Sequence, residues 1–148
     1  MIGMDILQPV VVLLAWTMVM WVWMYATRIP AMLKAGIDAK GMVGSTGASL
    51  RAQLPEKVSW KADNYNHLHE APTLFYAVAI VLAVIGHGDG INAMIAWAYV
   101  GLRIAHSIVQ ATINRVIIRF ALFALSSLAL MVLIFHAIIP VFDLHLHN

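Results

Sequence analysis

Three ionisable side chains, Glu70, Arg103 and His106, lie inside stretches of the sequence that are otherwise apolar. In a membrane, a charge near the bilayer centre costs about 2.5–3.5 kcal/mol, so such residues usually pair, face a polar cavity or take part in function. A carboxylate and a guanidinium are also opposite charges that can form a buried ion pair. These residues therefore predict either a polar ligand site or a structural ion pair.

Further polar residues extend these three into two stripes. The first follows the i, i+4, i+7, i+11 spacing that lines one face of a helix, and consists of Tyr99, Arg103, His106 and Gln110. The second consists of Asp63, Asn66, His67 and Glu70. Facing polar stripes predict a pocket for a polar ligand. Arg115 and Arg119, one turn apart at its mouth, would favour anionic groups.

Each of these features has a plainer alternative. The Glu70–Arg103 pair could serve only to tie two helices together. Arg115 and Arg119 could be topology residues that extend to lipid head groups, and His106 could hydrogen-bond to a neighbouring helix. Because the residues lie together on facing stripes, we favour a site.

The sequence argues against thiol chemistry by the chain itself, metal binding and nucleic-acid binding. The chain has no cysteine, which excludes disulfides, thiolate metal sites and cysteine nucleophiles, so any thiol must come from a ligand. His67 and His69 point about 200° apart on a helix, and the pair His145 and His147 lacks a third ligand, so we predict no metal site. The net charge is only +2 and comes from few charged side chains, so the sequence indicates no basic surface that would bind nucleic acid.

The composition identifies the elements that must position the stripes. The 148 residues are 62% hydrophobic and 11% charged, with a mean hydropathy of +0.85, whereas soluble domains average about 25% charged residues. Four apolar stretches predict spans at about residues 7–27, 63–85, 91–112 and 116–139, with a loop at about 28–62. We therefore predict an all-α membrane protein, a single domain over residues 1–148 folded as a four-transmembrane-helix antiparallel bundle.

The basic residues predict the orientation of this bundle. Six of the nine lie between the first and second spans, and Arg115 and Arg119 lie between the third and fourth. The positive-inside rule therefore places residues 28–63 and 112–119 in the cytoplasm and both termini on the non-cytoplasmic side. With a rise of about 1.5 Å per residue, Glu70 lies about 13 Å deep and Arg103 about 15 Å deep, so we expect them to form a buried pair.

Two segments resemble a known family. NYNHLHEAPTLFYA in the second span and AYVGLRIAHSIVQATINRVIIRF across the end of the third are similar to MAPEG, the membrane-associated proteins of eicosanoid and glutathione metabolism, and most similar to its bacterial branch. The resemblance covers roughly residues 57–125. It implies four-helix subunits that form a homotrimer, bind glutathione between adjacent subunits at the cytoplasmic side and, for a bacterial member, lie in the inner membrane.

The resemblance also implies roles for single residues. Glu70 matches the glutathione-contacting Glu of the family, and Arg119 matches the arginine that activates the thiol in prostaglandin E synthase. Further matches to the glutathione site are Arg28, Arg103, His106 and Arg115. The chain departs from the eukaryotic members of the family in two places: His67, beside Asn66, stands where they have an Asn, and Gln110 stands where they have a Tyr.

Together these observations predict a glutathione-dependent transferase or peroxidase. Its second substrate would be a lipophilic small-molecule electrophile that arrives from the membrane lipids, and Arg119 would stabilise the glutathione thiolate. The alternative is a non-catalytic membrane protein that binds an anionic lipid or a small solute, or relays protons, through the same stripes.

Overall fold

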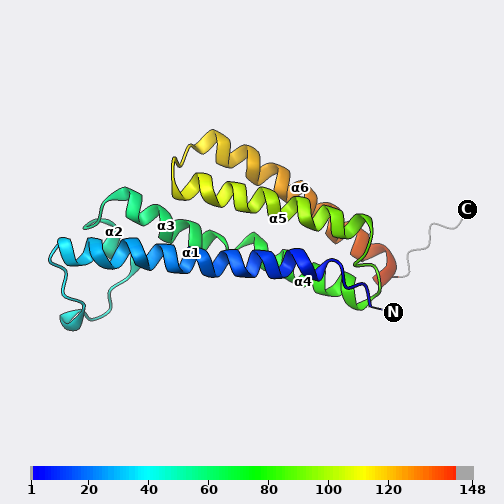
Figure 1. Ribbon diagram of the computed structural model, residues 1–148, viewed down its shortest axis with the longest axis horizontal. Helices are drawn as coiled ribbons and strands as arrows, with labels where there is room; N and C mark the ends of the chain where they lie inside the picture. Colours follow the sequence, from blue (N-terminus) through cyan, green and yellow to red (C-terminus); the bar gives the residue numbers. More distant parts are fainter. Residues whose placement is uncertain (1, 143–148) are drawn as a thin grey trace, which may run out of the picture.

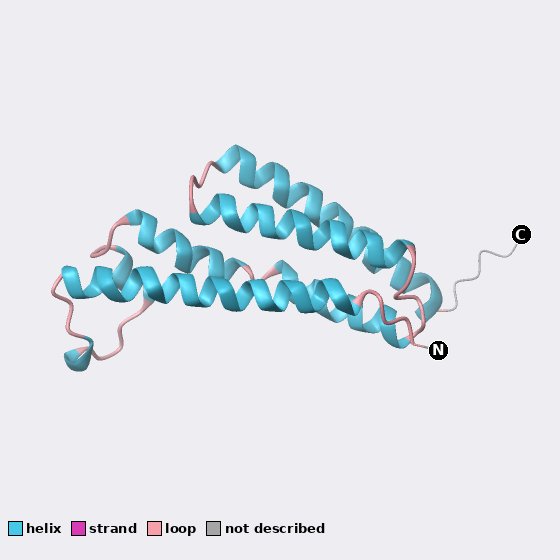
Figure 2. Ribbon diagram, in the orientation of Figure 1, coloured by secondary structure: helices cyan, strands magenta, loops and turns pink. Residues whose placement is uncertain are grey.

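The computed structural model describes residues 2–142, and the regular elements among them are all helical (Figure 2). In chain order they are α1 (Leu7–Lys34), η1 (Ala39–Gly41), α2 (Gly47–Arg51), α3 (Glu56–His67), α4 (Ala71–Val84), α5 (Ile91–Ala111) and α6 (Val116–Val141) (Figure 1). The prediction of an all-α chain is confirmed. The pair His145 and His147 lies outside the described residues.

The first helix is longer than the predicted span. α1 continues past residue 27, through Arg28 and Pro30, to Lys34, so the predicted loop begins seven residues later than expected. Pro30 lies inside this helix, which loses one backbone hydrogen bond there and continues to Lys34. At about 1.5 Å per residue the helix is about 42 Å long, more than the roughly 30 Å of a hydrocarbon core. Arg28 therefore lies on a helix instead of in a loop.

The second predicted span is two helices. α3 begins at Glu56, seven residues before the predicted start, and ends at His67, and α4 begins at Ala71. Pro72 at the start of α4 has no N–H to donate and its ring clashes with the carbonyl four residues earlier, which explains the break. Glu70 is the residue immediately before α4, with backbone angles outside the helical region. The predicted span at about 63–85 is therefore present within Glu56–Val84, but as two helices and not as one continuous helix.

The last two helices follow the prediction closely. α5 ends one residue before the predicted boundary, and α6 runs two residues beyond residue 139, through Pro140. Gly90 caps the start of α5 with a φ of 63°, and Asn114 in the connection to α6 has a φ of 49°. Both values lie in the left-handed region, which suits Gly and Asn in tight turns.

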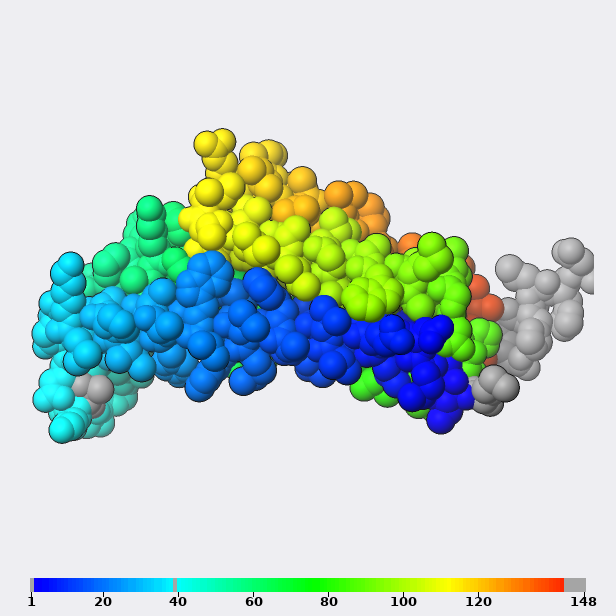
Figure 3. All heavy atoms as spheres, viewed as in Figure 1, coloured from blue at the N-terminus to red at the C-terminus, as the bar shows by residue number. Residues whose placement is uncertain are grey.

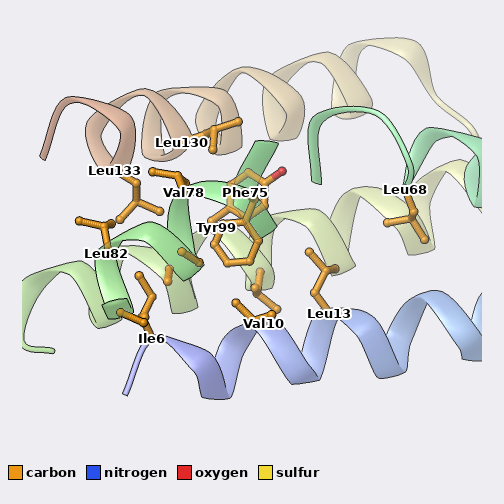
Figure 4. Close-up of a cluster of buried hydrophobic side chains, with 14 of the residues drawn as sticks. Ile6, Val10, Leu13, Leu68, Phe75, Val78, Leu82, Tyr99, Leu130 and Leu133 are labelled. Atoms are coloured by element: carbon orange, nitrogen blue, oxygen red, sulfur yellow. The ribbon is translucent and has the colours of Figure 1, made fainter. Parts of the chain in front are cut away.

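The helices pack as an elongated bundle (Figures 1 and 3). α5 packs along α6, α1 packs against α3 and α5, and α4 packs against α6. The apolar core contains side chains from α1, α4, α5 and α6, and the rings of Phe75 and Tyr99 stack at its centre with centroids 4.5 Å apart (Figure 4). Within residues 2–142, three segments are long and apolar enough to cross a membrane: α1, α3 with α4, and α6.

Backbone hydrogen bonds hold the segment before α1 against the turn between α4 and α5. The Gly3 amide donates to the carbonyl of Ala83 over 2.8 Å, and the Ile6 amide donates to that of Gly88 over 2.9 Å. A Cβ on Gly3 would lie 2.3 Å from the Gly88 nitrogen, so only glycine permits this approach. The antiparallel course of the helices brings these two segments to one end of the bundle, and α2 lies at the other end (Figure 1).

Candidate functional site

The first cavity lies where the end of α3 meets the second half of α5 and the start of α6. It has a volume of about 290 Å³ and is lined by His67, His106, Gln110, Val116, Arg119, Phe120 and Phe123. Four of these were predicted as site residues from the sequence: His67, His106, Gln110 and Arg119. The other three are apolar residues of α6, so the cavity has one polar wall and one apolar wall.

Arg103 lies one turn before His106 on α5 and is only 1% exposed. Its Nε and Nη1 atoms have no hydrogen-bond partner among the described residues. The predicted ion pair with Glu70 is absent from the described residues, because Glu70 instead accepts from His67 and its side chain is 68% exposed. The prediction assumed one continuous helix through residue 70, whereas the break between α3 and α4 changes the direction of the Glu70 side chain.

His67 contacts both Glu70 and His106. Its Nδ1 atom lies 3.1 Å from Oε2 of Glu70, and its ring centroid lies 4.9 Å from that of His106 and 6.0 Å from that of Phe123. The Nε2 atom of His67 is buried and has no hydrogen-bond partner among the described residues, and the same holds for Nδ1 of His106. Each of the two imidazoles that line the cavity therefore has one buried ring nitrogen whose hydrogen-bonding capacity is unused among the described residues.

A second cavity, of about 330 Å³, lies between α1, α2 and α3. Its lining consists of Arg28, Gly47, Ala48, Arg51, Ser59, Ala62, Asp63 and Asn66. It thus holds two predicted site residues, Arg28 and Asn66, that do not reach the first cavity. Neighbouring residues on a helix point about 100° apart, so Asn66 and His67 face different sides of α3. The predicted stripe is therefore divided: Asp63 and Asn66 line the second cavity, His67 lines the first, and Glu70 lines neither.

An exposed ion pair at this second cavity was missed by the sequence reasoning. Arg51 donates from Nη1 to both carboxylate oxygens of Asp63, over 2.8 and 2.7 Å. This hydrogen bond and the charge of Asp63 raise the pKa of Arg51 above its usual value. Thr46 and Ser49, three residues apart, form a capping box at the start of α2. This spacing in the sequence could have predicted the short helix that carries Arg51.

The remaining predicted residues differ in burial. Arg119 lies in the first turn of α6, and its Nε atom is buried without a partner among the described residues. Gln110 is 7% exposed, and its Oε1 atom is likewise without a partner. Arg115 precedes α6, is exposed and lines neither of the two cavities. The structure thus separates two arginines that the sequence placed together.

A buried polar bridge lies behind the first cavity and was not predicted. The hydroxyl oxygen of Ser107 accepts from Trp16 Nε1 over 2.8 Å and from Asn64 Nδ2 over 2.6 Å. Asn64 and Ser107 are both fully buried. The bridge joins α1, α3 and α5 and holds α5 at the residue that follows His106.

Comparison with protein families gives one result, a match of residues 6–139 to the model of the MAPEG family. The chain belongs to the MAPEG family. Comparisons with curated proteins and with solved structures find no match. The match is to the family as a whole, so membership of a bacterial branch stays a prediction.

Membership of MAPEG indicates that the long apolar helices cross a membrane. The MAPEG fold is a four-helix membrane bundle, and the chain is an integral, multi-pass membrane protein with three long apolar segments. α3 and α4 together make one 29-residue segment, Glu56–Val84, that is long and apolar enough to cross the bilayer. MAPEG is a family of glutathione-linked membrane enzymes, which agrees with a ligand that supplies the thiol that this chain lacks.

Proposed function

We propose that this MAPEG protein binds glutathione and directs its thiolate to a lipophilic electrophile. The observation that carries the proposal is the pair of cations at and beside the first cavity: Arg119 lines it, and Arg103 is buried one turn before His106, which also lines it. Arg103 and Arg119 have guanidinium nitrogens without partners among the described residues, and the nearest carboxylate, Glu70, is held by His67. An uncompensated buried charge is costly, so an anion is the ligand that this arrangement favours. Glutathione carries two carboxylates and can carry a thiolate.

Arg119 is suited to act on the sulfur. A nearby guanidinium lowers the pKa of a thiol from its free value of about 8.5 and so raises the fraction of thiolate at neutral pH. Arg119 also lies in the first turn of α6, where unpaired backbone N–H groups favour an anion. The apolar wall formed by Val116, Phe120 and Phe123 offers a place for the electrophile next to this sulfur.

We further propose that the complete site forms in a homotrimer. Arg28 and Asn66 line the second cavity, on the other side of α3 from Arg119. Contact between neighbouring subunits would bring the first cavity of one subunit to the second cavity of the next. One glutathione could then contact residues of both cavities. Cross-linking in detergent would test the assembly, with a trimer as the expected product.

A non-catalytic role is the alternative, and the second cavity is the observation that favours it. Arg28 and Arg51 lie there on elements next to the predicted cytoplasmic surface. Arg51 is paired with Asp63, whereas Nε of Arg28 has no partner among the described residues, so Arg28 is the group that suits an anionic head group. A protein of this kind would bind its ligand in a saturable way and would show no turnover.

The deciding experiment measures glutathione-dependent turnover by the purified protein in detergent. We expect conjugation of the aryl halide 1-chloro-2,4-dinitrobenzene or reduction of a lipid hydroperoxide, with a rate that saturates in glutathione. S-methylglutathione, which retains the carboxylates but has no thiol, should compete for binding and support no reaction. Saturable glutathione binding with no turnover of either substrate would favour the binding protein instead.

A further inference from the structure

His67 has an arrangement that differs from that of the other histidines among the described residues. It is the last residue of α3, and its Nδ1 atom lies 3.1 Å from Oε2 of Glu70, three residues later. A carboxylate can only accept a hydrogen bond, so Nδ1 is the donor and carries the proton. In the neutral ring, Nε2 then has the free lone pair. A carboxylate that fixes the tautomer of an imidazole in this way is typical of general bases.

The free nitrogen belongs to a ring in the wall of the first cavity. His67 lines that cavity together with His106, Gln110 and Arg119, and its Nε2 atom is buried without a partner among the described residues. His106 lines the same cavity, but no carboxylate bonds to it among the described residues. Gln110 has an amide, which cannot accept or release a proton at neutral pH. His67 is therefore the residue of this wall best able to exchange a proton with a ligand.

We infer that His67, oriented by Glu70, is a general acid–base of this site, and that the reaction it suits is addition of a thiol to an activated double bond. The inference rests on the proposed function, because the thiol is that of glutathione. It does not follow from the family resemblance, because eukaryotic members of the family have an Asn at the position of His67. An Asn can orient a ligand but cannot carry a proton.

The proton balances in such a reaction. His67 accepts the thiol proton at Nε2, and Arg119 stabilises the thiolate that remains. The sulfur forms a bond to the β carbon of an α,β-unsaturated carbonyl compound, and the π electron pair moves to the α carbon as an enolate. His67 then returns the proton to the α carbon. One S–H and one C=C π bond are exchanged for one C–S and one C–H bond, and nothing leaves the site.

The fate of the thiol proton favours addition over displacement. In an addition, the proton that His67 accepts returns to the product, so acid and base steps both use this one side chain, which is 21% exposed. Displacement of halide from an aryl halide leaves one proton that has to leave the site. Four charged or titratable groups face His67. They are Glu70, which precedes α4, Arg103 and His106 on α5, and Arg119 on α6. The carboxylate of Glu70 is the one anion among them.

The first test follows the proton on glutathione binding and needs no turnover. The thiolate formed is measured by its ultraviolet absorbance, and the protons released are measured by calorimetry in buffers of different ionisation enthalpy. In the wild type we expect far fewer protons released than thiolate formed, because His67 keeps them. In His67→Gln we expect about one proton released per thiolate, or loss of the thiolate with glutathione still bound. Equal ratios in the two proteins would overturn the inference.

The second test compares two electrophiles, the enal trans-2-nonenal and 1-chloro-2,4-dinitrobenzene. General acid–base catalysis contributes about 10²–10⁴-fold, so His67→Gln and His67→Asn should each lower kcat for the enal by about 100-fold. The loss for the aryl halide should be smaller, and Glu70→Gln should show the same bias. His69→Gln is the matched control, because His69 is exposed and its Nδ1 contacts the Tyr65 carbonyl outside the cavity.

The outcomes separate this inference from the proposed function. Wild-type turnover together with His67 variants that keep kcat for the enal within about twofold would leave the proposed function in place and remove the role of His67. Absence of glutathione-dependent turnover in the wild type would remove both. Thermal unfolding with and without glutathione shows whether each variant is folded, and His67→Asn, which introduces the residue of eukaryotic members of the family, guards against misfolding of His67→Gln.

Discussion

At the scale of single residues, the two arginines around the start of α6 have different surroundings. Arg119 lines the first cavity, whereas Arg115 is exposed and lines neither cavity. A residue that stabilises charge on the reacting sulfur affects kcat, and one that only attracts the ligand affects KM. The family resemblance assigns the thiol to Arg119, and Arg119 is the one of the two that lines the first cavity, so we predict that Arg119 acts on the sulfur and Arg115 on binding.

Arg119→Ala should lower kcat by about tenfold or more, which is at least about 1.4 kcal/mol in barrier height, and should raise the pKa of bound glutathione. Arg115→Ala is the matched control and should mainly raise KM. Initial rates and thiolate absorbance across a range of pH measure both effects. An Arg119→Ala protein with unchanged kcat and thiol pKa would exclude Arg119 from the mechanism.

Arg103 calls for a revised prediction. Removal of one partner of a buried ion pair typically costs about 3–5 kcal/mol, but Arg103 has no such partner among the described residues. Arg103→Leu should therefore leave thermal stability in ligand-free detergent solution unchanged or higher. The stabilisation that glutathione confers should be lost. Thermal unfolding with and without glutathione measures both, and a large loss of ligand-free stability would indicate that Arg103 is paired in the assembled protein.

At the scale of elements, the buried bridge at Ser107 determines where α5 lies relative to α1 and α3. Ser107→Ala would leave the Trp16 indole and the Asn64 amide without their acceptor. An unsatisfied buried donor costs about 1–3 kcal/mol, so we expect a loss of about 2 kcal/mol or more, above the roughly 0.6 kcal/mol average for one hydrogen bond between membrane helices.

Denaturant unfolding in mixed micelles measures this loss. Ser127→Ala, a partly buried serine on α6, is the control and should cost far less. Because Ser107 follows His106, the Ser107 variant should also weaken glutathione binding. Equal stability of the two variants would show that the bridge contributes nothing.

The elements differ in how far the sequence predicts them. α5 and α6 were predicted to within two residues, because apolar runs ended by Gly90 and Asn114 define both helices. The break at residues 68–70 was missed, because a run of apolar residues indicates that a segment can cross a membrane but does not show whether it forms one helix or two. The predicted Glu70–Arg103 pair depended on one continuous helix. Three of the first cavity's residues, His67, His106 and Gln110, came from helical spacing, whereas Arg51 had no periodic pattern to indicate it.

At the scale of the whole molecule, the orientation in the membrane is the first property to test. Ser45 precedes α2 at one end of the bundle, and Asp89 lies in the turn between α4 and α5 at the other end. Cysteines introduced at these two positions in this cysteine-free chain should be labelled from opposite sides of the membrane, with Ser45→Cys labelled from the cytoplasm. Labelling of Asp89→Cys from the cytoplasm alone would reverse the topology and move the site to the other face.

The backbone contacts of Gly3 with Ala83 and of Ile6 with Gly88 have a consequence for biosynthesis. About eighty residues separate the two sides of this contact, so α1 leaves the ribosome and enters the bilayer well before its partner turn has been made. During that interval α1 depends on lipid alone. Its apolar, uncharged run from Leu7 to Thr27 satisfies this requirement, and the turn then closes onto a helix that is already inserted.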